Sequence, residues 1–193
     1  MISVFYNDKP IILTTKVEKE TDFKNFLLKD VPLKHILRCL NKKKYNSVKL
    51  IHHNEKTLIK HFSKKLPIVI AGGGKVINDN RDSLFIFRND KWDLPKGKTE
   101  KNESIRETAI REVTEETGVK NIEVVSELTT TYHIFKHRGI PKLKITYWFN
   151  MRTSYDGVLS PQNNEGITKA VWHNEKNTAL ALQNSYANIK LLF

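Results

Sequence analysis

The sequence is poor in cysteine and lacks any long apolar run, and both absences narrow its class. Cys39 is the only cysteine, which excludes an internal disulfide and a cysteine-rich zinc site. No 18 consecutive residues are apolar, and Asp8, Lys9 and Pro10 stand where a signal peptide needs an apolar core. We therefore expect a soluble, cytoplasmic protein that does not associate with membranes.

Acidic residues are few relative to basic ones. The chain of 193 residues carries a formal net charge of +12 and 39% hydrophobic residues, enough for a core. Residues 1–66 hold 15 Lys and Arg against 6 Asp and Glu, a net of +9, whereas residues 67–193 hold 18 against 15, a net of +3. The excess favours polyanionic partners such as nucleotides, inositol polyphosphates or nucleic acid, although it equally serves solubility alone.

Residues 1–66 predict a small basic α+β region. Two β-rich runs flank Asn7-Asp8-Lys9-Pro10, which is typical of a hairpin. Apolar spacing predicts a helix within residues 31–45, a strand over residues 47–53 and a second helix that begins at Asn54. A region of this size is marginal alone, so we expect it to pack against the rest, with a boundary near residues 65–67.

Residues 67–193 predict an α/β sandwich with a mixed sheet, because strands precede, separate and follow two helices. The first of these helices is expected over residues 103–117 and ends at Gly118. Gly72-Gly73-Gly74 lacks the spacing of a phosphate loop or a dinucleotide fingerprint, so it predicts a close backbone approach or a bulge within a strand.

Six glutamates are crowded into residues 97–119, in a chain that is otherwise basic. At about 100° per residue, Glu112, Glu115 and Glu116 run along the edge of the apolar face of the predicted helix. Three like charges directed toward the protein would repel one another, so a cation is expected among them. Oxygen ligands suit hard divalent ions, Mg²⁺ above all and Mn²⁺ next, and Mg²⁺ typically joins carboxylates to substrate phosphates.

The loop before this helix fits the same chemistry. Gly97 lets the backbone turn sharply and present a carbonyl to a metal, and Lys96 and Lys98 stand ready for phosphate charge. Arg111 has two candidate partners, Glu103 and Glu107. It either holds the helix to the loop or forms an ordinary surface ion pair.

The complete pattern resembles the Nudix box, Gx5Ex7REUxEExGU with U an aliphatic residue. Gly97, Glu103 and the run from Arg111 to Val119 match every fixed position. The resemblance implies a Nudix-type α/β/α sandwich with a mixed β-sheet over residues 67–193, preceded by the small α+β region 1–66. It also implies an enzyme that hydrolyses a nucleoside diphosphate linked to another group, by attack of a metal-activated water on phosphorus.

The resemblance also assigns roles to residues. It implies that Glu112, Glu115 and Glu116, with the carbonyl of Gly97, bind Mg²⁺ or Mn²⁺. Glu103 pairs with Arg111 to orient the site, and Gly118 ends the helix. The general base varies within the family, so Glu112 inside the box and Glu165 in a later loop are both candidates.

The stretch Trp92 to Lys98 resembles the W-x-x-P-K-G run of Nudix enzymes that act on dinucleoside polyphosphates, diphosphoinositol polyphosphates and capped RNA. We therefore expect a small, strongly anionic phosphoanhydride as the substrate, with Trp92, Lys96 and Lys98 as binding residues. An alternative is a Nudix-type regulator that binds a nucleotide and uses residues 1–66 to contact nucleic acid. The sequence also allows a homodimer.

Overall fold

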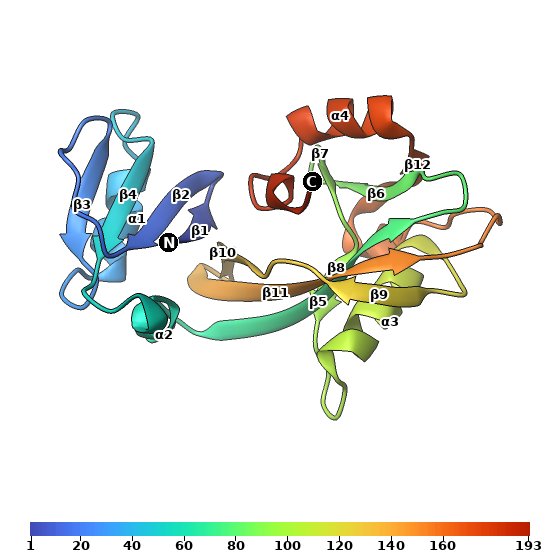
Figure 1. Cartoon of the computed structure of the whole chain (residues 1–193), viewed down its shortest axis with the longest axis horizontal. Helices are drawn as coiled ribbons and strands as arrows, with labels where there is room; N and C mark the ends of the chain where they lie inside the picture. Colours follow the sequence, from blue (N-terminus) through green and yellow to red (C-terminus); the bar gives the residue numbers. More distant parts are fainter. The chain divides into compact units, whose positions relative to one another are not determined.

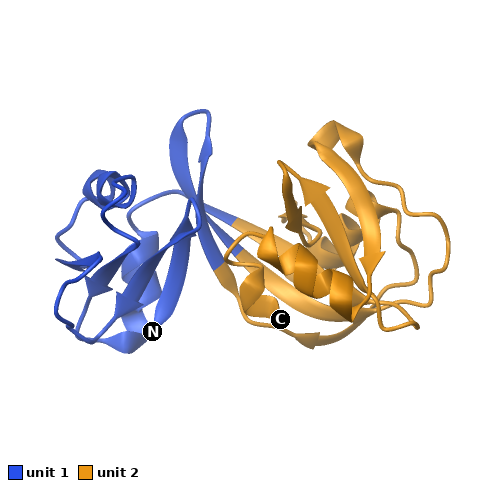
Figure 2. Ribbon diagram, turned by 90° about the horizontal axis from the view of Figure 1, so that it is seen from above, with its two compact units in different colours: residues 1–69, 132–145 blue, residues 70–131, 146–193 orange.

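The computed structural model describes residues 1–193, which divide into two compact units (Figure 2). Unit 1 comprises residues 1–69 and 132–145, and unit 2 comprises residues 70–131 and 146–193. The sequence placed residues 132–145 in the second domain. They group with unit 1 because Val4 and Phe5 pair in parallel with Tyr132 and His133. The division at residue 66 therefore stays a prediction.

Unit 1 is a mixed sheet with the strand order β10-β1-β2-β4-β3 and two helices (Figure 1). Its elements are β1 (Ile2–Tyr6), β2 (Lys9–Thr14), β3 (Phe23–Leu27), α1 (Leu33–Leu40), β4 (Ser47–Ile51), the 3₁₀ turn η1 (Glu55–Thr57), α2 (Leu58–Ser63) and most of β10 (Thr131–His137). The predicted hairpin is confirmed, because β1 and β2 pair antiparallel around Asn7 and Asp8, which both have positive φ. Strand β3 was missed by the sequence analysis.

The two predicted helices of unit 1 are confirmed with different ends. Helix α1 buries Ile36, Leu37 and Leu40 in the core of this unit. The second helix begins as the 3₁₀ turn η1, where the side chain of Asn54 accepts a hydrogen bond from the backbone N–H of Lys56. Apolar packing of both helices on one sheet gives unit 1 a core of its own.

Unit 2 has the strand order β12-β6-β5-β11, to which three short strands are added. Strand β7 pairs with β6, β8 with β5, and β9 with β11. The elements are most of β5 (Ile68–Ile77), β6 (Ser83–Arg88), β7 (Lys91–Asp93), β8 (Lys96–Lys98), α3 (Ile105–Thr117), β9 (Glu123–Glu127), the C-terminal part of β11 (Ile140–Arg152), η2 (Asn163–Glu165), β12 (Ile167–His173), α4 (Glu175–Gln183) and η3 (Lys190–Leu192). Two separate strands, β9 and β10, follow α3.

The sheet of unit 2 lies between α3 and α4 (Figure 1). Neighbouring strand residues point to opposite faces, and Leu84 packs in the cluster that contains Val113 of α3, whereas Phe85 packs with Ala181 of α4. The predicted α/β/α sandwich with a mixed sheet is thus confirmed. No helix of the structure combines the length and apolar character that a membrane crossing requires.

The three adjacent glycines of β5 are sites of close packing, as the sequence predicted. A Cβ on Gly72 would lie 2.6 Å from the carbonyl oxygen of Ile105 in α3, and a Cβ on Gly73 would lie 2.6 Å from the ring of Trp148. Strand β5 also pairs Gly72 with Gly97 of β8. These contacts bring α3 and the loop around Gly97 against the same strand, which places the glutamates of α3 beside that loop.

Candidate active site

Both ends of α3 are fixed by local sequence. Ser104 accepts a hydrogen bond from the backbone N–H of Glu107, whose carboxylate accepts one from the N–H of Ser104, which forms a capping box. Gly118 ends the helix with a φ of 76°, a conformation that glycine adopts without strain. The register of the three glutamates between these ends is therefore set by the sequence itself.

Glu116 is the most buried of the three, with 0% exposure. Its Oε2 accepts a hydrogen bond of 2.8 Å from the backbone N–H of Lys96. Its Oε1 is buried without a hydrogen bond, and the nearest cation, Nη1 of Arg88, lies 3.8 Å away. Burial raises the pKa of Glu116 to about 7, despite the opposing attraction of Lys96. A buried carboxylate with an unsatisfied oxygen is well suited to receive a cation.

Glu112 lies against the backbone of Gly97. A Cβ at position 97 would approach Oε2 of Glu112 to 2.0 Å, so any side chain there would displace this carboxylate from its present position. Oε1 of Glu112 accepts a hydrogen bond of 2.8 Å from Nη1 of Arg111. Burial raises the pKa of Glu112, and the guanidinium of Arg111 opposes that rise.

Glu115 is more exposed but shares a partner with Glu112. Its Oε2 accepts a hydrogen bond of 2.9 Å from the same Nη1 of Arg111. The carboxylates at 112 and 115 therefore face one guanidinium group, on the side of α3 that the helical spacing predicted.

Arg111 pairs with Glu103 rather than Glu107, which settles the two alternatives left by the sequence. Nε and Nη2 of Arg111 donate to the two oxygens of Glu103 at 2.7 and 3.0 Å, and Nη2 also reaches the carbonyl of Lys98 at 3.1 Å. The hydrogen bonds from Arg111 lower the pKa of Glu103 to about 2. This bidentate pair joins the loop to α3, while Glu107 is occupied in the helix cap.

Glu165 is brought to the same site from a distant part of the chain. Its Oε2 lies 3.6 Å from Nη1 of Arg88, the group that also lies near Glu116. The charge of Glu165 contributes to the raised pKa of Glu112. Sequence reasoning missed Arg88, because its position at the end of the strand-like run 83–88 carries no motif.

Three residues predicted to bind substrate lie in different surroundings. Lys98 is exposed and forms no ion pair with an acidic side chain, and its predicted role in substrate binding stays a prediction. Lys96 is buried, and its Nζ donates a hydrogen bond of 2.6 Å to Asp93. Trp92 packs edge-on against Phe85. The predicted roles of Lys96 and Trp92 in substrate binding stay predictions, and the pairing of Lys96 with Asp93 was missed.

The donor set fits a hard divalent cation, although its side chains are turned elsewhere in this structure. No three His, Cys, Asp or Glu side chains are gathered as a formed metal site, since Glu112 and Glu115 are directed toward Arg111. The unsatisfied Oε1 of Glu116 and the space that Gly97 leaves for Glu112 are nevertheless the features that an oxygen-ligated ion requires.

Comparison with known proteins identifies one family. A family model described as the NUDIX domain matches residues 70–192. The MutT protein from Methanosarcina mazei Go1 is a similar solved structure, with 23% identity, a TM-score of 0.48, and coverage of 64% of this chain and 88% of that one. An Ap4A hydrolase from C. elegans, in a binary complex, has 16% identity, a TM-score of 0.45 and coverage of 60% and 86%.

A third similar structure is a bifunctional NMN adenylyltransferase/ADP ribose pyrophosphatase from Francisella tularensis, complexed with AMP and a Mn ion. It has 18% identity and a TM-score of 0.46, and the match covers 65% of this chain and 40% of that one. Similarity at this level does not transfer a substrate.

Proposed function

Because this chain belongs to the Nudix family, we propose that it hydrolyses a pyrophosphate bond in a nucleoside diphosphate derivative. The observation that carries this proposal is the arrangement of Glu112 and Glu116. Both carboxylates are buried on one side of α3, one of them beside Gly97 and the other with an oxygen that lacks a hydrogen bond. Two neighbouring buried acids with raised pKa values, one of which has an oxygen without a hydrogen bond, indicate a site built for a positively charged ligand.

We propose that Glu112, Glu115 and Glu116, with the carbonyl of Gly97, hold Mg²⁺ or Mn²⁺. An ion bound there supplies positive charge for phosphate oxygens and lowers the pKa of water. Arg111 is connected to Glu103, Glu112 and Glu115 at once, so it sets the direction of both acids and keeps the loop in place.

Two residues are candidates for the general base, which accepts the proton of the attacking water. Glu112 has a raised pKa as a result of burial, which makes its carboxylate a better proton acceptor. Glu165 is exposed and lies near the cation Arg88. The two candidates differ in exposure, so the base at position 165 would exchange its proton with solvent more readily.

We propose a dinucleoside polyphosphate or a similar polyanion as the substrate. Lys98 is exposed and free for phosphate, and Arg88 adds a second cation with only long contacts to carboxylates. Lys96 does not add to this count, since its charge is used by Asp93. Two available cations beside a metal site favour a substrate with more phosphate charge than a single diphosphate.

A panel of phosphoanhydrides tests this proposal. Diadenosine tetraphosphate, ADP-ribose and an oxidised dGTP would be incubated with the full chain and Mg²⁺, and the products identified by mass. Fastest turnover of the dinucleoside polyphosphate supports the proposed substrate class. Faster turnover of ADP-ribose or oxidised dGTP would assign a different substrate but keep the hydrolase activity. Absence of hydrolysis of every compound, with either Mg²⁺ or Mn²⁺, would contradict the enzymatic proposal.

The regulator hypothesis stays as a second candidate because residues 1–66 carry a net charge of +9. It requires binding of nucleic acid, which an assay with residues 1–193 at a series of salt concentrations measures directly. A cytoplasmic location and a homodimer also stay predictions.

A further inference from the structure

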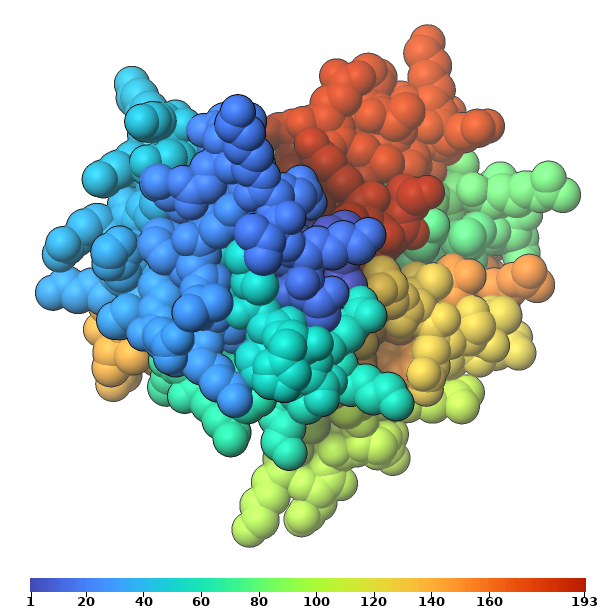
Figure 3. All heavy atoms as spheres, turned by 60° about the vertical axis from the view of Figure 1, so that its left-hand side comes forward, coloured from blue at the N-terminus to red at the C-terminus, as the bar shows by residue number.

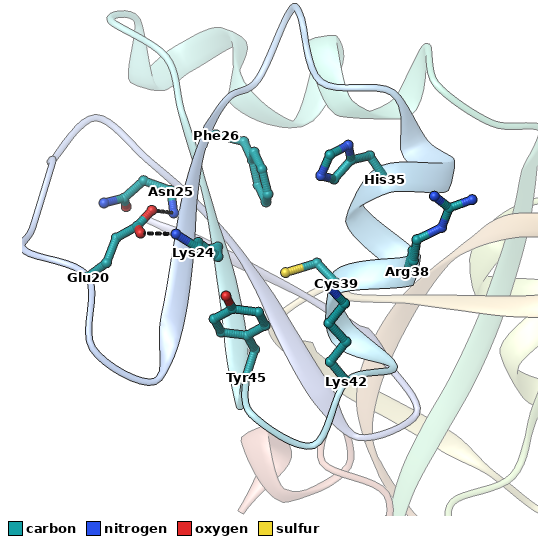
Figure 4. Close-up of a pocket in the computed structure, with 9 residues that line it drawn as sticks. All are labelled: Glu20, Lys24, Asn25, Phe26, His35, Arg38, Cys39, Lys42 and Tyr45. Atoms are coloured by element: carbon teal, nitrogen blue, oxygen red, sulfur yellow. Dashed lines mark hydrogen bonds and ion pairs between the residues drawn. The ribbon is translucent and has the colours of Figure 1, made fainter.

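Unit 1 contains a cavity of about 250 Å³ that the proposed hydrolysis does not use (Figure 4). The side chains that matter for its chemistry are Lys24, Phe26, His35, Arg38, Lys42 and Tyr45. At about 30 Å³ per water molecule, the volume corresponds to roughly eight waters. A single planar ring system fits such a space, and a duplex does not.

The cavity lies between an edge strand and a helix. Strand β3 is the last strand in the order of unit 1, and Lys24 and Phe26 point to the same face because they are two residues apart. Helix α1 supplies His35 and Arg38 from successive turns, and Lys42 follows just beyond its end. One face of a helix thus borders a pocket whose other wall is an open sheet edge.

The basic side chains of this cavity are not equally free. Lys24 forms an ion pair with Glu20 (Figure 4). Arg38 and Lys42 are exposed, and neither forms an ion pair with an acidic side chain. Side chains from this part of the chain, blue to teal, project from the surface in Figure 3. Two unpaired cations at the rim of a cavity are available to an anionic ligand.

The remaining walls are aromatic. Phe26 and Tyr45 lie on different sides of the cavity in Figure 4, and both are only partly buried. The ring of His35 meets the ring of Phe26 edge-on, with 5.3 Å between centroids. Both rings also pack against the core of unit 1, and Lys44 lies over the ring of Tyr45. Partly exposed aromatic rings beside cations are the combination that binds a stacked base and its phosphate.

We propose that unit 1 binds a nucleotide in this cavity, with the base against Phe26 and Tyr45 and the phosphate at Arg38 and Lys42. The ligand is either a free mononucleotide or one residue of a single-stranded nucleic acid, since both present a planar base and a phosphate. The proposal is independent of the proposed hydrolysis, because every residue that it uses lies in unit 1. If the basic residues of unit 1 served solubility alone, they would not need to surround a cavity with aromatic walls.

Binding of a labelled oligodeoxythymidine to the full chain, measured by fluorescence anisotropy in EDTA, tests the phosphate contacts. The double variant Arg38→Gln/Lys42→Gln should bind at least about tenfold more weakly. The slope of log K against log salt should shrink by about 1.4, since each cation that no longer neutralises a phosphate of a single strand lowers it by about 0.7. Lys56→Gln/Lys60→Gln removes the same charge from exposed positions outside the cavity and should bind like wild type. Equal losses in both double variants would overturn the proposal.

The base contact is tested at Tyr45. Tyr45→Leu should weaken binding by about tenfold, in the range of one stacked base, whereas Tyr45→Phe keeps the ring and should bind like wild type. Thermal unfolding of each variant checks that unit 1 is intact. If Tyr45→Leu folds and binds normally, the base does not lie in this cavity.

Competition identifies the source of the ligand. If AMP displaces the strand and an equal concentration of inorganic phosphate does not, the cavity recognises a nucleotide. Tighter binding of the strand than of AMP assigns the ligand to single-stranded nucleic acid, and the reverse order assigns it to a free nucleotide. Displacement by phosphate as effective as by AMP, or stronger binding of a duplex than of the single strand, would overturn the proposal.

Discussion

Lys96 forms its hydrogen bond to Glu116 through its backbone, whereas its side chain forms a hydrogen bond to Asp93. The N–H of Lys96 donates to Oε2 of Glu116 at 2.8 Å, while its Nζ donates to Asp93 at 2.6 Å. Burial alone would lower the pKa of Lys96, but attraction to Asp93 and Glu116 outweighs this effect and raises it. The loop before α3 therefore carries a buried charge pair at the residue whose backbone N–H supports Glu116.

We expect Glu116→Gln to lower kcat by about 100-fold or more, because a ligand to the divalent ion loses its charge. The folded structure should be retained, since glutamine also accepts the hydrogen bond from Lys96. Glu107→Gln is the matched control on the same helix, because glutamine also serves in a capping box. Initial rates of both variants are measured across a Mg²⁺ titration, and thermal unfolding checks that each variant is folded. Near-normal turnover by Glu116→Gln would remove this residue from the metal site.

Gly97→Ala should lower kcat/KM by roughly 100-fold, because the new Cβ would displace the carboxylate of Glu112, and a shift of about 1 Å in a catalytic group has an effect of this size. Gly139→Asn is a suitable control: no atom lies within 4 Å of a Cβ there, and asparagine tolerates the positive φ. Steady-state kinetics measure kcat/KM of both variants and of the wild type. Unchanged kinetics of Gly97→Ala would mean that Glu112 does not act from this position.

Asp93→Asn should destabilise the protein by about 3–5 kcal/mol, because it leaves the buried ammonium of Lys96 without its counter-charge. Adding Lys96→Met removes both charges, so the double variant should recover much of this loss. Urea unfolding measures the free energy of unfolding of four proteins: the wild type, Asp93→Asn, Lys96→Met and the double variant. These four values form a double-mutant cycle. A double variant as unstable as the sum of the two single variants would show that the pair is not coupled.

Gly72→Ala should destabilise unit 2 by about 1–3 kcal/mol, because its Cβ would lie 2.6 Å from the backbone carbonyl of Ile105 and no rotamer change relieves that contact. Ser126→Ala, at an exposed strand position, is the control. The midpoint of denaturant unfolding, followed by tryptophan fluorescence, measures both. An unchanged midpoint for Gly72→Ala would mean that α3 can shift away from β5 at little cost.

Glu103 should contribute stability that depends on pH. Its pKa is about 2 in the folded protein, below the value of 4.5 for a free glutamate, so the contribution is complete above about pH 5 and is lost as the pH falls toward 2. The effect should be roughly 1.5–3 kcal/mol, the range of hydrogen bonds to charged groups. Urea unfolding at a series of pH values should show wild type losing its advantage over Glu103→Gln below pH 4.5. A difference that is constant with pH would contradict the assignment.

Local patterns in the sequence were sufficient to predict helix α3 and the side on which its acidic residues lie. Ser104 and Gly118 mark the ends of α3, and the spacing of Glu112 and Glu116 places both acids on its buried side. Local sequence patterns could not predict contacts between residues that are far apart in the chain. Arg88 reaches the site only because β6 ends beside the loop that carries Glu165.

Two further misses have physical reasons. Lysine beside a glycine loop predicts a solvated cation. Asp93 is only three residues away, but the local sequence does not show that both side chains are buried as a pair. Strand β3 alternates weakly, with Lys24 and Asn25 between its two phenylalanines, so its hydrophobic pattern is short and diluted. It forms because β4 offers a pairing edge.

Because residues 132–145 complete unit 1, its core includes Ile134 and Leu143, which follow α3 in the chain. During synthesis on a ribosome, the first 69 residues emerge without these two side chains and without the strand that flanks β1. Unit 1 is therefore complete only after residue 145 has been synthesised, which differs from the usual order in which an N-terminal domain folds before the next one is made. Removal of residues 1–66 alone would accordingly expose Ile134 and Leu143 to water.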